Sequence, residues 1–206
     1  GTQFSLALKA NGTLWSWGEN KWGKLGIGSS VITFVNIPTQ VGTENNWINL
    51  AAGEHHAHAI QSNGTLWSWG DGGAGQLGLG NAPHNNTIPT QAGTDHNWTS
   101  VSGGYWHSVG VKANGTLWIW GMDEVYSGWR PSPVQFGTAN NWVQAGAGGF
   151  YSMARTSNGT VFDWGDVLFF GQLAGSHKIS LGTDGLFLQS DGTLQSANRT
   201  TSVQAD

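Results

Sequence analysis

The sequence predicts an all-β protein, a β-propeller or part of one, made of tandem antiparallel blades. Two observations carry this prediction. A segment that begins with Asn-Gly-Thr-Leu recurs along the chain, and its clear copies follow stretches in which residues alternate in polarity. Period-two alternation is typical of β-strands, and no segment shows the period of a helix.

The recurring segment defines the repeats. Its first two copies read Asn-Gly-Thr-Leu-Trp-Ser-Trp-Gly without a difference, the third has Ile119 for the serine, and later copies diverge. The copies begin at Asn11, Asn63, Asn114, Asn158 and, in degenerate form, Asp191. We expect one repeat domain over residues 1–206 with an atypical terminal region at 166–206, because a terminal repeat meets solvent or a different neighbour.

Each copy begins with a hairpin turn. Asn-Gly between two alternating runs is the strongest short-range hairpin signal, and we expect a type I′ turn with both central residues at positive φ. The runs before the first two turns include Phe4–Leu8 and His56–Ile60. After the first turn come Trp15 and Trp17, which share one side of their strand, so such pairs should fill gaps between blades.

A further element precedes each alternating run from the second repeat onward. It begins with a Trp, and a Pro stands nine residues earlier each time: Trp47 with Pro38, Trp98 with Pro89, and Trp142 with Pro133. Three or four short strands in roughly 45–50 residues is the size of one propeller blade. Because these Trp residues recur in register, we interpret them as packing residues.

Specific motifs in the first two repeats carry a family resemblance. The second unit ends in Trp69-Gly70 and continues into the loop Gly75-Gln76-Leu77-Gly78, which the first repeat has as Gly23–Gly28. The fourth keeps Gly171-Gln172-Leu173 of this loop. The unit resembles the repeat of the regulator-of-chromosome-condensation family, most closely its bacterial versions.

The resemblance implies a propeller, commonly of about seven blades. The chain holds about four to five repeats. It is therefore expected to be a fragment of a longer protein, a smaller ring or an open array. Open blade edges would also favour self-association. The family's eukaryotic founder is a nucleotide-exchange factor for a small GTPase, an activity associated with an inserted wedge that has no counterpart here. Similarity to propeller-type β-lactamase inhibitors implies that such scaffolds bind proteins through their loops.

Composition narrows the classes of partner. Charged residues make up 10% of the chain and the net charge is −4, with no basic run that would neutralise nucleic acid. No apolar stretch approaches the roughly 20 residues of a membrane helix. Cys is absent, which excludes disulfides and thiolate metal sites. The uncharged polar surface predicts an extracellular or cell-surface protein, bacterial or phage-associated. The start at Gly1 suggests processing or an excised fragment.

No residue pattern indicates catalysis or a cofactor, so the sequence predicts a protein that is not an enzyme. Carboxylates are scattered, and no Gly-x-Ser-x-Gly elbow occurs. His56 and His58 would face one side of a strand, which leaves a metal site as an alternative. Because His107 shares the repeat position of His56 while Phe4 and Tyr151 fill it elsewhere, we favour a packing role.

Aromatic residues that break the repeat are the candidate binding residues, because the repeat itself does not require them. They are Trp22, Tyr105, Trp106, Tyr126 and Trp129. Trp and Tyr dominate protein-binding hot spots and also stack on sugar faces. The sequence therefore predicts a non-enzymatic binding or scaffold module that recognises a protein partner through propeller loops. The alternatives are a lectin-like adhesion module that binds glycans and, less favoured, a nucleotide-exchange factor.

Overall fold

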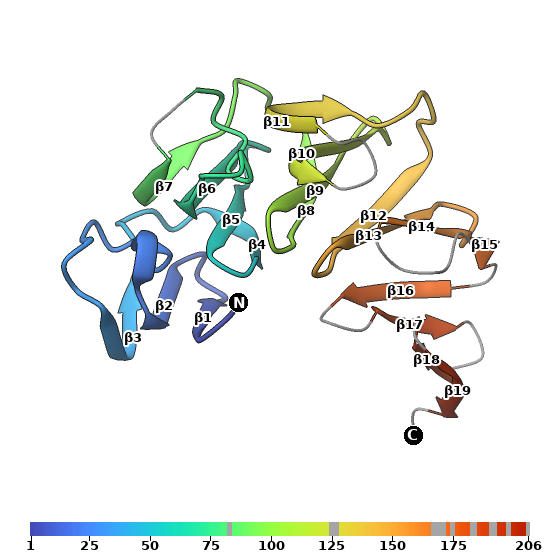
Figure 1. Ribbon diagram of the computed structural model, residues 1–206, viewed down its shortest axis with the longest axis horizontal. Coiled ribbons are helices and arrows are strands. Elements are labelled where there is room, and N and C mark those ends of the chain that lie inside the picture. The colour runs from blue at the N-terminus through green and yellow to red at the C-terminus, as the bar shows by residue number, and fades with distance from the viewer. Residues whose placement is uncertain are drawn as a thin grey trace.

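The computed structural model describes residues 1–81, 84–123 and 128–165, and beyond them the backbone of the strands between 172 and 204. Within these residues the chain folds into five antiparallel sheets, each built from consecutive strands, which confirms the all-β propeller prediction (Figure 1). The sheets stand in an open arc rather than a closed ring. We refer to them as blades 1 to 5 in chain order.

Blade 1 contains β1 (Phe4–Leu8), β2 (Leu14–Glu19) and β3 (Phe34–Gln40), with a short 3-10 turn, η1 (Lys21–Gly23), between the last two. Blade 2 contains β4 (Trp47–Ala52), β5 (His56–Gln61), β6 (Leu66–Asp71) and β7 (Asn85–Gln91). Blade 3 contains β8 (Trp98–Gly103), β9 (His107–Lys112), β10 (Leu117–Asp123) and β11 (Gly128–Gln135).

Blade 4 contains β12 (Trp142–Ala147), β13 (Tyr151–Thr156), β14 (Val161–Gly165) and β15 (Gln172–Leu173). Blade 5 contains β16 (Ser176–Leu181), β17 (Gly185–Gln189), β18 (Thr193–Ser196) and β19 (Arg199–Gln204). The expectation that Gln172 and Leu173 belong to a loop is wrong, since they pair with Phe162 and Val161 as a fourth strand. Because the fourth repeat is shorter than the first two, these residues occupy the position of the outer strand in blade 4.

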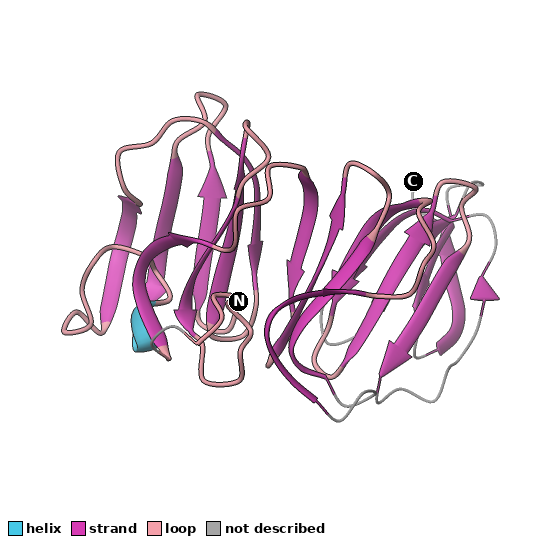
Figure 2. Cartoon of the chain, turned by 90° about the horizontal axis from the view of Figure 1, so that it is seen from above, coloured by secondary structure: helices cyan, strands magenta, loops and turns pink. Residues whose placement is uncertain are grey.

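The strands take fixed places in each blade. The inner strands β4, β8 and β12 together line a central hollow of about 330 Å³. The outer strands β3, β7 and β11 form exposed sheet edges and carry the recurrent prolines. Proline suits an edge strand because it lacks an N–H and so discourages pairing with another chain. Loops gather at the two ends of the upright strands (Figure 2).

The Asn-Gly hairpins differ from the expected type I′ turn. In the first of them the Gly12 N–H donates to Lys9 O and the Lys9 N–H to Thr13 O, which closes a three-residue loop. Only Gly12, at φ 77°, has positive φ, whereas Asn11 does not. This is a type I turn followed by a left-handed glycine, the usual form of a three-residue hairpin loop.

The Asn and Thr of the motif have a specific local role. In blade 2 the Asn63 side-chain oxygen accepts a hydrogen bond from the Thr65 hydroxyl at 2.7 Å, and Trp67 Nε1 donates to that hydroxyl oxygen at 2.9 Å. Blades 1 and 3 repeat this chain of contacts. The motif therefore ties the turn to the first Trp of the following strand.

The paired Trp residues have two different partners. Trp67 packs edge-on against Trp47 of its own blade, with ring centroids 5.9 Å apart. Trp69 is fully buried and its Nε1 donates to Lys24 O of blade 1 at 3.1 Å. Trp120 makes the equivalent bond to Gln76 O of blade 2 at 2.8 Å. The first Trp thus fills a blade, and the second fills the seam to the preceding blade.

Candidate functional site

One end of the array carries the non-repetitive aromatic residues. We call it the loop rim, and it consists of the turns before β1, β5, β9 and β13 and the connections between β2 and β3, β6 and β7, and β10 and β11. Strand direction places four of the candidate binding residues at this end. Tyr105 and Trp106 directly precede β9, Trp22 lies just after the end of β2, and Trp129 lies at the start of β11 beside the end of β10. Tyr126 lies outside the described residues.

Backbone hydrogen bonds join the rim turns of successive blades. The N–H of Thr2 donates to Glu54 O at 3.3 Å, that of Glu54 to Gly104 O at 3.0 Å, and that of Tyr105 to Gly149 O at 3.2 Å. These turns surround a cavity of about 290 Å³ at the mouth of the central hollow. The rim is therefore a rigid edge, because each turn is fixed to the next.

At the seam between blades 1 and 2 the rim is covered by its own aromatic residue. Trp22, which occupies a strained left-handed conformation at φ 59°, lies against the His55 ring with centroids 4.3 Å apart. Lys21 Nζ sits 4.1 Å from the Trp22 ring centroid. Burial lowers the pKa of His55 despite the nearby Glu54 carboxylate. Trp22 is half-buried, so much of its surface is used within the chain.

At the seam between blades 2 and 3 the aromatic residue that covers the rim in blade 1 is not repeated. Ala74 takes the repeat position of Trp22 in blade 2, and Trp106, which takes that of His55, is 42% exposed. Trp106 and Tyr105 both pack edge-on against Phe150 of blade 4, with ring centroids 5.4 Å and 5.0 Å apart. Three aromatic side chains thus form one continuous surface across two blades.

This surface continues outward along blade 3. The Met122 N–H donates to Trp106 O at 2.8 Å, and Met122 is the cross-strand partner of Trp129. Met122 is 46% exposed and Trp129 53% exposed. Cross-strand partners present their side chains on the same face of a sheet. Trp129, Met122, Trp106, Phe150 and Tyr105 therefore make an apolar row from the outer strand to the central mouth, which we call the aromatic row.

Sequence reasoning missed Phe150 and Met122. Phe150 stands at the repeat position of Trp106 and His55, directly before the alternating run. A comparison of the residues at this position in successive repeats would have revealed it. Met122 follows the Trp-Gly ending and carries no signal in the sequence. Only the fold brings it beside Trp129.

A buried cation supports the rim in blade 1. Lys24 has no exposed side-chain surface, forms an ion pair with Glu19 and donates to Thr2 O at 2.9 Å. The hydrogen bond from Lys24 lowers the pKa of the Glu19 carboxyl. Repeat 2 has Gln76 at the Lys24 position, and its side chain accepts from the Ala74 N–H at 2.8 Å. Both residues hold rim loops in place.

The buried histidines form a network across the seam between blades 2 and 3. Ser108 Oγ lies 3.0 Å from His56 Nε2, 2.8 Å from His58 Nε2 and 3.0 Å from Gln76 O. Because the single hydroxyl proton goes to the carbonyl, both Nε2 atoms must carry protons and donate to Ser108. His58 Nδ1, 2.8 Å from Ser68 Oγ, is then an acceptor.

This network bears on the metal alternative. Both rings are fully buried, and burial lowers the pKa of His58 to about 3 and that of His56 well below its usual range. Metal binding would require a free nitrogen lone pair, whereas His58 Nδ1 accepts from Ser68 and His58 Nε2 carries the proton that it donates to Ser108. Within residues 1–81, 84–123 and 128–165, no group of three or more potential metal ligands occurs. The geometry assigns His56 and His58 to packing of the seam.

The described part of the chain also has no helix long and apolar enough to cross a membrane. Antiparallel blades of three or four strands around a common hollow, with an aromatic loop rim at one end, define the class: a β-propeller module. The chain belongs to the family of proteins with regulator of chromosome condensation (RCC1) repeats, whose models match residues 11–60, 63–111 and 98–126.

Relatives with known names extend this likeness. The chain is 32% identical over 120 residues to the mitochondrial RCC1 domain-containing protein RUG3 of Arabidopsis thaliana, covering 57% of this chain and 27% of that protein. It is 30% identical over 144 residues to the guanine nucleotide exchange factor SRM1 of Saccharomyces cerevisiae, covering 62% of this chain and 30% of that protein. The chain thus spans about a third or less of these two relatives.

Solved structures show the same fold. Human WBSCR16 superposes with a TM-score of 0.82 at 20% identity, covering 94% of this chain and 59% of that one. Prp20p from Saccharomyces cerevisiae, described together with its binding to Gsp1p and histones, has a TM-score of 0.76 at 21% identity, covering 95% of this chain and 55% of that one. At this identity the likeness supports the propeller fold.

Proposed function

We propose that this chain is a non-enzymatic recognition module that binds a protein partner through its loop rim, with Trp106 as the central contact. The exposed aromatic row carries the proposal. Aromatic anchors dominate binding energy at protein interfaces, and Trp is the most enriched of them. A backbone bond joins Tyr105 to Gly149 of the next blade and another joins Met122 to Trp106 within blade 3, so little order has to be gained on binding.

The family supports this proposal. Its named members include an exchange factor, and a structural neighbour is described by its binding to Gsp1p and to histones. These are properties of other proteins, but they give two defined probes for a first experiment, a small GTPase and core histones. Exchange activity is the second candidate, favoured by the likeness to SRM1. Secretion or display at the cell surface stays a prediction from composition.

The test compares Trp106→Ala with Ile88→Ala, a control that removes another exposed apolar side chain, 55% exposed, from the outer strand β7. Binding of Gsp1p, histones and proteins from a cell extract is measured by affinity capture and quantified for each variant. We expect Trp106→Ala to weaken capture at least about tenfold, because a hot-spot truncation costs ~2 kcal/mol or more. Equal capture by both variants would show that the rim is not the site.

A glycan array run with the same proteins distinguishes the lectin alternative. Binding to a sugar that Trp106→Ala abolishes, together with no captured protein, would favour adhesion to glycans. Release of labelled nucleotide from Gsp1p, measured with and without the chain, separates exchange activity from simple binding.

A further inference from the structure

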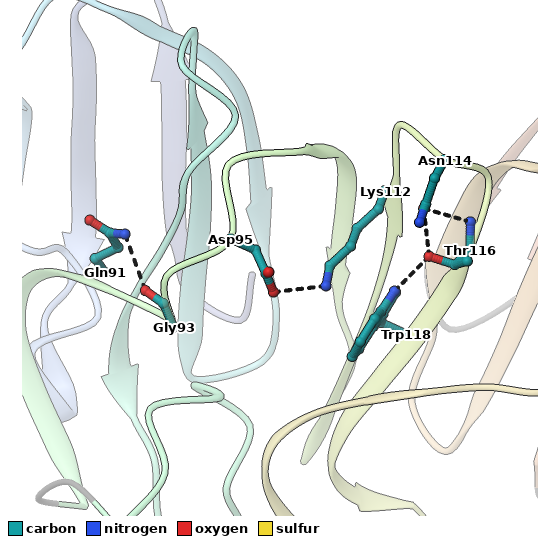
Figure 3. Close-up of polar contacts among 7 residues, drawn as sticks. All are labelled: Gln91, Gly93, Asp95, Lys112, Asn114, Thr116 and Trp118. Carbon is teal, nitrogen blue, oxygen red and sulfur yellow. Dashed lines mark hydrogen bonds and ion pairs between the residues drawn. The ribbon is translucent and has the colours of Figure 1, made fainter.

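Blade 3 contains an aromatic cage that is filled by a lysine of the chain itself, Lys112, which Figure 3 shows with Asp95 and with Trp118, one of the two walls. Lys112 Nζ lies 3.3 Å from the centroid of the Trp118 ring and 4.6 Å from that of Trp98. It also forms an ion pair with Asp95 at 2.8 Å, and its side chain is only 5% exposed. The ammonium is thus bound by two aromatic walls and one carboxylate.

The cage sits at the Asn-Gly turn end of the blade, opposite the loop rim. Lys112 immediately precedes the three-residue turn Ala113-Asn114-Gly115, and Trp118 is tied to that turn through Thr116. Because the turn recurs in every clear repeat, the same place can be located in the other blades.

Blade 4 repeats the walls of this cage. Trp142 takes the position of Trp98, and Phe162 takes that of Trp118. Their rings meet edge-on with centroids 5.3 Å apart at 75°, close to the 6.0 Å and 69° of the blade 3 pair. Trp142 is 9% exposed and Phe162 is 39% exposed, so one wall is buried and the other reaches solvent.

Blade 4 lacks the residues that fill the cage in blade 3. Thr156 stands at the position of Lys112, and Ala139 stands at that of Asp95. A cavity of about 180 Å³ lies between them and the two aromatic rings. Because a water molecule occupies about 30 Å³ in the liquid, a cavity of this volume has room for a small substituted ammonium group.

The polar groups around the cavity restrict what kind of cation fits. The Thr156 hydroxyl lies 2.6 Å from Asn158 Oδ1 and 3.0 Å from Thr160 O, so its single proton is already engaged by these two acceptors. A primary ammonium brings three N–H donors, which in blade 3 have the Asp95 carboxylate as a charged partner, and none of the described lining residues of the blade 4 cavity is a carboxylate. A quaternary ammonium has no N–H and is attracted by aromatic faces alone.

From this comparison we infer that the blade 4 cavity is a binding site for a methylated, quaternary ammonium group, of the kind found in trimethyllysine and choline. The occupied cage of blade 3 shows the mode of binding, and Trp142 and Phe162 supply the two walls. The inference is independent of the loop rim, since the two sites lie at opposite ends of the strands.

The first measurement follows the indole N–H resonance of Trp142 by NMR during titration with tetramethylammonium and choline, and with dimethylbutanol, the uncharged carbon analogue of choline. We expect saturable shifts with both cations and at least about tenfold weaker binding of the alcohol. This difference follows if the attraction of the positive charge to the aromatic rings contributes ~1.4 kcal/mol to the free energy of binding. Equal binding of the alcohol would mean an ordinary apolar pocket and would overturn the inference.

Peptides distinguish the two natural sources. Binding of a trimethyllysine peptide more tightly than free choline would identify a modified protein as the ligand, whereas equal or weaker binding would identify a small quaternary amine. In either case an unmodified lysine peptide should bind at least about tenfold more weakly, because none of the described lining residues is a carboxylate that could take the place of Asp95.

Two substitutions copied from blade 3 complete the test. Thr156→Lys should place a lysine between Trp142 and Phe162 and abolish cation binding. Ala139→Asp should strengthen the binding of the unmodified lysine peptide about tenfold by restoring the missing carboxylate. Circular dichroism confirms that both variants fold, and Thr156→Gln, the residue of blade 2, is the control of similar size. Cation binding that survives Thr156→Lys in a folded protein would contradict the assignment.

Discussion

His58 Nε2 lies 2.8 Å from Ser108 Oγ, across the seam between blades 2 and 3. The bond joins two strands far apart in the sequence and buries a titratable ring between blades. His56 and His58 donate to the same hydroxyl, and burial, which lowers the pKa of both rings, keeps them neutral.

Acid should destabilise the protein through these rings. Burial lowers the pKa of His58 from 6.5 to about 3, so below pH 6.5 the unfolded chain binds a proton that the folded chain does not. The stabilisation is complete above pH 6.5 and is lost as pH falls toward 3, by up to about 1.4 kcal/mol per pH unit for each ring. Urea unfolding between pH 7.5 and 4 measures the slope. His58→Leu, which introduces the residue that blade 1 has at this repeat position, should reduce this pH slope, while His96→Gln on the surface should not.

The contact between His107 and Ser152 should behave as a coupled pair. His107 Nε2 lies 2.8 Å from Ser152 Oγ at the seam between blades 3 and 4, and both residues are buried. At the seam of blades 1 and 2 the same positions hold Phe4 and Ala57, which share one core cluster. We expect Ser152→Ala to cost about 1–3 kcal/mol, and the double variant with His107→Phe to cost at least ~1 kcal/mol less than the two single changes together. Strict additivity in a double-mutant cycle would refute this coupling.

Two glycines should respond very differently to alanine. Gly64 and Gly93 have φ of 78° and 70°. A Cβ added to Gly64 would overlap the carbonyl oxygen of His96, whereas a Cβ added to Gly93 would have no atom within 4 Å. Both changes bring the left-handed strain of about 1–2 kcal/mol. We therefore expect Gly93→Ala to cost about that amount and Gly64→Ala about 3 kcal/mol or more. Similar melting temperatures for the two variants would show that the turn can shift.

The aromatic walls should matter more to Lys112 than its ion pair. Lys112 is 5% exposed at its side chain and Asp95 is 54% exposed, so solvent weakens the charge pair. Asp95→Asn should cost no more than about 1 kcal/mol, whereas Lys112→Met should cost about 2 kcal/mol by losing attraction to both rings. The free energy of unfolding of both variants is measured in low and in high salt. The larger cost, that of Lys112→Met, should persist in high salt, where surface ion pairs are screened. An opposite order of the two costs would place the stabilisation in the ion pair.

Much of the architecture could be predicted because it is local and repeated. Period-two alternation, the Asn-Gly-Thr turn and the recurrent Trp and Pro residues predict strands, hairpins, buried positions and outer edges. The turn type was predicted incorrectly, since the Asn-Gly signal does not distinguish a two-residue loop from a three-residue loop. The candidate binding residues followed from breaks in the repeat, and the structure places four of them at one rim.

The sequence by itself determined the repeat, the blade and the family, because alternation and turn chemistry act between residues that are close along the chain. Only the tertiary structure decided which side chains meet across seams. Trp106 meets Phe150 because adjacent blades align their turns, and His58 meets Ser108 because β5 lies against the next blade. The filled cage of Lys112 and the open one at Thr156 differ by two residues, a difference that gains meaning only when the strands place those residues between aromatic rings.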